Sequence, residues 1–191
     1  MAIRFQHAPE RAVQSISAAL NALKVMPVQP FAFPSEEPRE LLHHPHIIYH
    51  VGLEDLVSGK GISSAKPVRW AFLVGAGGAA NAIAEVTYDR QELSQLNQGP
   101  YAAGILETLA RTEDSKEIAA GEYEFNILRI PGIYVVALWL KDIRGGAHVF
   151  VAVPPAPHEL EAGRIRSEEE FLGIVRLLAG RALPTNPPPL A

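Results

Sequence analysis

The sequence predicts a single α+β domain: an antiparallel sheet of about five strands with helices packed on one of its faces. Three consecutive β-rich runs, at residues 122–127, 133–140 and 148–153, carry this prediction. The first run alternates polar and apolar residues, as expected of a strand with one buried face. The second is almost wholly apolar, so it has to be covered on both faces or lie at the centre of a sheet. Its two polar atoms, the Tyr134 hydroxyl and the Trp139 ring N–H, then need hydrogen-bond partners inside the protein.

The remaining core elements precede these three runs and give the order strand, strand, helix, three strands, helix. Residues 68–74 and 83–88 read as two strands around a glycine-rich connection, and residues 47–51 also have the composition of a strand. A helical segment follows, interrupted near Gly99 and best defined over residues 101–112, where apolar side chains recur at helical spacing.

Both ends of the chain carry an amphipathic helix. Residues 9–26 place apolar side chains at helical spacing and end before a proline. Near the C-terminus, Ser167 and Glu170 form a capping box, in which each side chain accepts a hydrogen bond from the other residue's backbone N–H. The helix that starts there has Gly180 as its expected end.

The changes in composition along the chain predict three regions. Residues 1–46 hold the first helix, a proline-rich strap at residues 27–34 that carries Phe31 and Phe33, and a short second helix over residues 35–44. The α+β core occupies residues 47–182. Residues 183–191 are proline-rich and predicted to be an extended tail.

The composition excludes several classes of protein. The 191 residues include no cysteine, which removes disulfide scaffolds, thiolate metal sites and thiol catalysis. The net charge is −4 and basic residues are scattered singly, so we expect no nucleic-acid partner. No secretory signal is visible, and no apolar run approaches the roughly 20 residues of a membrane-spanning helix. We therefore expect a cytoplasmic protein without a membrane partner.

Residues 72–83 contain the first candidate binding motif. Gly75, Gly77 and Ala80 follow an apolar strand with the spacing of a dinucleotide-binding fingerprint. Over about ten residues this segment resembles the glycine-rich loop of shikimate-dehydrogenase-like Rossmann domains, and the resemblance implies that backbone N–H groups of these residues approach a pyrophosphate. The alternative is a β-hairpin loop that needs glycine for positive φ angles, because residues 83–88 turn strand-like almost at once.

A second candidate is the histidine cluster His43, His44, His46 and His50. Imidazoles at this density can bind zinc, copper or nickel. No carboxylate lies at a recognised metal-ligand spacing from them, and Pro45 opposes the helix that would align His46 with His50. The alternative is a polar corner of solvated imidazoles where a helix meets a strand.

No segment supplies a coherent catalytic set, and we expect no cofactor. Ser63 and Lys66 match one motif of serine acyl-enzymes, but its partner motifs are absent. The leading hypothesis is a non-catalytic interaction or assembly protein, with a protein partner or a second copy of the chain, because proline-rich segments lie at both ends. The alternative is a small enzyme or ligand-binding domain with its site at the Gly75–Ala80 loop or the His43–His50 cluster.

Overall fold

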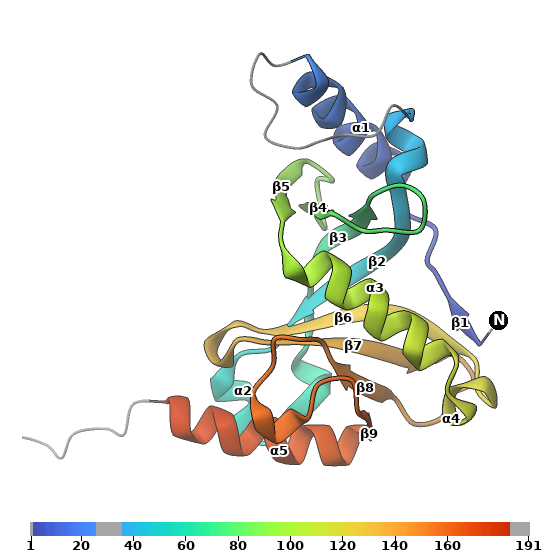
Figure 1. Ribbon diagram of the computed structural model, residues 1–191. Coiled ribbons are helices and arrows are strands. Elements are labelled where there is room, and N and C mark those ends of the chain that lie inside the picture. Colours follow the sequence, from blue (N-terminus) through green and yellow to red (C-terminus); the bar gives the residue numbers. More distant parts are fainter. Residues whose placement is uncertain (1, 26–35, 184–191) are drawn as a thin grey trace, which may run out of the picture.

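The computed structural model describes residues 2–25 and 36–183 (Figure 1). Over these ranges the protein is a mixed α+β structure with one nine-stranded sheet and five α-helices. The strands are β1 (Ile3–Arg4), β2 (Leu42–His50), β3 (Lys66–Val74), β4 (Ala82–Thr87), β5 (Leu93–Gln98), β6 (Tyr123–Ile130), β7 (Val135–Asp142), β8 (Val149–Ala152) and β9 (Ile165–Ser167). The helices are α1 (Glu10–Lys24), α2 (Leu53–Val57), α3 (Pro100–Glu113), α4 (Lys116–Ala119) and α5 (Glu168–Ala182).

The sheet is larger than predicted and partly parallel, so the expectation of five antiparallel strands is wrong in both respects. The strand order is β5-β4-β3-β2-β6-β7-β8-β9, and β1 also pairs with β6. Strands β2 to β5 form an antiparallel meander, after which α3 and α4 return the chain to the free side of β2. There β6 runs parallel to β2, with Ile48 opposite Ile127. A parallel pair needs such a long helical connection.

Helices cover both faces of the sheet, not the single face predicted (Figure 1). One face, here called the α3 face, carries Ile48, Ile127 and Leu138 and packs against α3. The opposite face, here called the α5 face, carries Trp139 and Phe150 and packs against α5. The helices contribute Ile105 and Leu109 from α3, and Phe171 and Val175 from α5. Strand β7 therefore has apolar neighbours on both sides, as its composition requires.

Both predicted terminal helices are present. Helix α1 buries Ala12, Ile16 and Leu20 against β3 and β4. Helix α5 starts with the predicted capping box: the Ser167 hydroxyl accepts from the Glu170 N–H, and the Glu170 carboxylate accepts from the Ser167 N–H at 3.0 Å. It continues past Gly180 to Ala182, so the predicted end of this helix is two residues early.

Several local predictions differ from the structure. The short helix expected up to His44 is a single 3₁₀ turn, Pro38–Leu41, and β2 begins immediately afterwards. Strand β5 occupies part of the segment predicted to be helical. Tyr134 is 84% exposed with a φ of 53°, because the Pro131–Gly132 connection turns in a 3₁₀ helix before β7 starts. The buried Trp139 ring N–H has no hydrogen-bond partner among the described residues.

The predicted strap at residues 27–34 lies outside the described residues, as does the tail from residue 184 onward. The proposed boundary at residue 46 falls inside β2, and α1 packs against the same sheet as the core helices. Among the described residues, no helix combines the length and the apolar character that crossing a membrane requires.

Candidate functional sites

The first candidate site joins the glycine-rich loop to the start of the histidine cluster. The loop connects β3 to β4, and β2 lies on the other side of β3. His43 is therefore placed opposite Leu73, and its Nε2 lies 3.0 Å from the Gly75 carbonyl oxygen. Both predicted segments line one cavity of about 120 Å³. Its lining residues are His43, His44, Leu73, Gly77, Gly78, Ala79, Ala80 and Leu106.

The loop has the geometry of the hairpin alternative. It joins antiparallel strands, with Val74 opposite Ala82, and no helix begins at its end. Gly77 and Gly78 have positive φ angles of 61° and 81°, and a Cβ on Gly75 would lie 1.9 Å from the Ala79 carbonyl oxygen. These glycines are required by the turn itself. Binding of a cofactor by Gly75, Gly77 and Ala80 stays a prediction. The loop is followed by β4, so no helix N-terminus is present there to bind a pyrophosphate.

The four histidines do not converge. His43 and His44 line the cavity, and a bulge between His43 and His46 gives His44 a φ of 51°. His46 is fully buried against Phe125 and its Nδ1–H donates to the His44 carbonyl oxygen at 2.7 Å. Within the described ranges, no group of three or more histidine or carboxylate side chains could hold a metal ion. Metal binding at these residues stays a prediction.

The last histidine of the series, His50, belongs to a different group, here called the central charged cluster. It consists of His50 on β2, Arg69 on β3, Glu85 on β4 and Arg129 on β6. Side chains two positions apart along a strand point to the same face. Each member of the cluster is two positions from a core residue of the α3 face on its own strand, so all four lie on that face. Four strands that are neighbours in the sheet thus bring four ionisable groups together at one end of α3.

Glu85 is the centre of this cluster and is completely buried. Its Oε1 accepts a hydrogen bond from the Arg129 Nη2 at 2.6 Å, and its Oε2 lies 3.2 Å from the Arg69 Nε. Burial lowers the pKa of His50, and the positive charges of Arg129 and Arg69 lower it further, against the opposing effect of Glu85. His50 is therefore held in its neutral form near neutral pH.

A cavity of about 260 Å³ opens beside the central charged cluster. It lies between the ends of β4 and β5 and the first turn of α3, with Glu85 and Arg129 on its inner side. Apolar contact comes from Ile83, and Tyr101 contributes an aromatic ring. Polar groups at the base, apolar walls and an opening at exposed residues are features of small-molecule sites.

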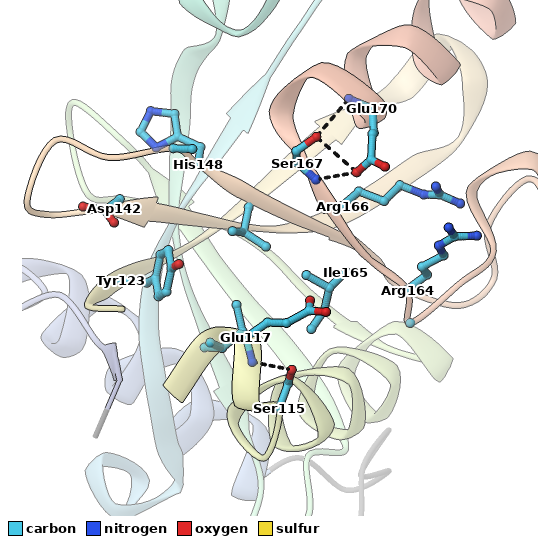
Figure 2. A pocket seen from close by; sticks show the side chains of 14 residues that line it. Ser115, Glu117, Tyr123, Asp142, His148, Arg164, Ile165, Arg166, Ser167 and Glu170 are labelled. Carbon is cyan, nitrogen blue, oxygen red and sulfur yellow. Dashed lines mark hydrogen bonds between the residues drawn. The ribbon is translucent and has the colours of Figure 1, made fainter. Parts of the chain in front are cut away.

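A wider cavity, of about 710 Å³, lies at the opposite end of the sheet (Figure 2). Figure 2 shows Glu117 from α4, His148 from the segment just before β8, Arg166 from β9 and Glu170 from the start of α5 around it. Most of its charged groups already have partners in the protein. The Arg164 Nη1 donates to both carboxylate oxygens of Glu161, at 3.0 and 2.9 Å. Arg166 donates to the Leu160 carbonyl oxygen, and Glu170 belongs to the capping box. This wide groove therefore has few charged groups that are free to select a ligand.

The central charged cluster is not among the sites predicted from the sequence. Its members are single charges inside otherwise apolar strands: Glu85 in an Ala-Ile-Ala-Glu-Val run and Arg129 between Leu128 and Ile130. A charged residue in a buried strand needs a partner, and this is the signal that was available. The strand order decides which charged residues become partners. Sequence periodicity alone does not predict this order.

No family model, curated protein or solved structure matches the chain.

Proposed function

We propose that this protein is a non-catalytic assembly protein that self-associates through the free edge of β5. One observation carries the proposal: β5 is an outer strand of the sheet, and within residues 2–25 and 36–183 it pairs with β4 alone. Its six residues, Leu93–Gln98, are half-buried or exposed. An unpaired strand edge offers a row of backbone donors and acceptors to another chain. Among the described residues, only the first donor of this row, the Leu93 N–H, is seen to donate to a side chain, the Ser15 hydroxyl of α1 at 3.0 Å.

The side chains of β5 provide none of the usual protection against such pairing. Proteins commonly guard an edge strand with lysine, with proline or with an inward-pointing charge. Leu-Ser-Gln-Leu-Asn-Gln contains no charge and no proline. Pairing of two copies is therefore unopposed by the side chains along this edge.

A second copy is the partner that fits this strand. In an antiparallel pair centred on Leu96, Gln95 of each copy lies opposite Asn97 of the other. Every facing pair is then neutral, so the two-fold arrangement brings no like charges together. Such a contact uses the same residues from both copies, as two-fold dimers require.

The test is the oligomeric state over a concentration series, measured by light scattering and native mass spectrometry. We expect the wild-type chain to dimerise. Gln95→Lys combined with Asn97→Lys places like charges opposite each other twice and should weaken the dimer about tenfold. Gln95→Lys combined with Asn97→Glu carries opposite charges at the same places and should dimerise normally. A wild-type chain that stays monomeric, or equal dimerisation of both variants, would refute the proposal.

A second candidate is a ligand-binding domain, favoured by the cavity that the glycine-rich loop shares with His43 and His44. Below these polar groups its walls are apolar, from Leu73, Ala80 and Leu106. At about 120 Å³ it is close in size to the roughly 150 Å³ apolar cavity that takes up benzene or xenon.

Benzene is therefore a suitable probe of this second candidate. We expect benzene to shift the methyl NMR signals of Leu73 and Leu106 in a saturable way. The half-buried Leu106 lies on the wall, so Leu106→Trp should fill the cavity and abolish saturation. Unchanged signals in the wild-type chain would count against this candidate and would leave the assembly proposal untouched.

A further inference from the structure

The guanidinium group of Arg129 has hydrogen-bonding capacity that the described residues do not use. Its side chain is only 20% exposed, and within the described part of the chain it makes one hydrogen bond, to Glu85. A guanidinium carries five N–H donors in a planar fork. Arg129 also lines the 260 Å³ cavity, so its remaining donors are available at the wall of that cavity. A largely buried cation with unused donors beside a cavity indicates a site for an anion.

The charges around the cavity do not balance. Arg69 and Arg129 bring two positive charges, Glu85 brings one negative charge, and neutral His50 adds none. Glu85 and Arg129 are the charged residues that line the cavity, and Arg69 contacts Glu85 from outside this lining. The cluster as a whole therefore keeps one excess positive charge close to a partly enclosed space, where Coulomb interactions are stronger than in bulk water.

The first turn of α3 adds to this positive potential. Gly99 precedes the helix without a side chain to cap it, and Pro100 has no N–H. The Tyr101 N–H, at the cavity, has no hydrogen-bond partner among the described residues. The N-terminal end of a 14-residue helix carries a partial positive charge that favours anions.

We propose that this cavity binds a small organic carboxylate, with the carboxylate group against the Arg129 guanidinium and the start of α3. A single negative charge matches the single excess positive charge. A doubly charged phosphate would instead be repelled by Glu85, which lines the same cavity. The apolar part of the ligand lies against Ile83 and the Tyr101 ring. At about 260 Å³ the cavity accepts a compact molecule, just below the roughly 300 Å³ at which drug-sized sites begin.

The proposal is tested on the full chain with benzoate, followed by calorimetry and by amide NMR shifts of residues 97–102. Benzamide, its neutral counterpart, and inorganic phosphate are the comparison probes. We expect saturable binding of benzoate, with binding of benzamide and of phosphate at least tenfold weaker. Phosphate binding as tight as benzoate, or no saturable binding of benzoate, would overturn the proposal.

Two arginine variants separate binding from structure. Arg129→Gln and Arg69→Gln each remove one of the two arginines that contact Glu85, but only Arg129 lines the cavity. Benzoate affinity should fall at least tenfold in Arg129→Gln and only about threefold in Arg69→Gln, which removes a nearby positive charge but no donor from the cavity wall. Equal losses in both variants would show that the effect is structural and would overturn the proposal.

A third variant covers the case in which Arg129→Gln does not fold. Asn97 is exposed, lies opposite Ile83, and so projects on the α3 face at the mouth of the cavity. Asn97→Phe should block the entrance and abolish benzoate binding while the melting temperature stays near that of the wild-type chain. Unchanged benzoate affinity in this variant would contradict the site. Because phenylalanine is uncharged, Asn97→Phe adds no like-charge repulsion to the dimer contact proposed for β5.

Discussion

Replacement of Glu85 by alanine is expected to lower the free energy of unfolding by about 3 kcal/mol, among the largest effects of any single substitution in this chain. Glu85 is completely buried, whereas the side chains of Arg69 and Arg129 are 28% and 20% exposed. Removing the carboxylate leaves two guanidinium groups close together without their shared counterion. Their partial access to water keeps the expected loss at the lower end of the range for broken buried ion pairs.

The matched control for this variant is Glu122→Ala. Glu122 also contacts two arginines, Arg4 at 3.0 Å and Arg144, but both of these arginines are more than half exposed. Ion pairs that remain in contact with water contribute little, so we expect a loss below about 1 kcal/mol. Guanidinium unfolding curves of both variants at neutral pH give the comparison. Similar losses for Glu85→Ala and Glu122→Ala would contradict the stabilising role assigned to the buried cluster.

Acidification from pH 7 to pH 5 is expected to destabilise the protein by about 2 kcal/mol through His46. Burial lowers the pKa of His46 from 6.5 to about 4, because its imidazole is enclosed by protein and a charge there would lose its hydration. As the pH falls below 6.5, the unfolded chain binds a proton that the folded protein does not take up. Stability is therefore highest above pH 6.5 and declines until the pH approaches 4.

Unfolding curves at pH 7, 6 and 5 measure this decline, and His46→Leu is the control. The leucine variant lacks the hydrogen bond from Nδ1 to the His44 carbonyl oxygen, so it should be about 1 kcal/mol less stable at pH 7. Its stability should nevertheless depend less on pH. The remaining slope is assigned to His44 and His50, whose pKa values burial also lowers. An identical pH dependence in both proteins would show that His46 is not the responsible group.

Elements with a strong local signal could be predicted from the sequence. The capping box at Ser167 fixes the start of α5 because its hydrogen bonds lie within one turn of the chain. The alternation around Phe125 and the apolar run around Leu138 identify β6 and β7 in the same way. Strand β5 was missed because Leu93–Gln98 is polar and has no clear period of two, as is common for a strand at the edge of a sheet.

The assembly of the candidate sites could not be predicted, because it depends on which strands are neighbours. The glycine-rich loop and the histidine cluster were recognised separately, and only the β2–β3 pairing places His43 next to Gly75. In the same way, Glu85 meets Arg129 only because β6 inserts beside β2 in a parallel orientation. Side-chain periodicity indicates which face a residue occupies, but it gives no information on strand order.

Strand β6 has a consequence for how the chain reaches its folded state. On one edge it pairs with β1 and then with β2, and on the other with β7, so it joins segments from the start, the middle and the later part of the chain. A ribosome releases β1 and the whole β2–β5 meander before β6 exists. Until then the inner edge of β2 has no neighbour and is open to pairing with other chains. Contacts between segments this distant in sequence also slow folding, so this protein is expected to acquire its structure late in synthesis.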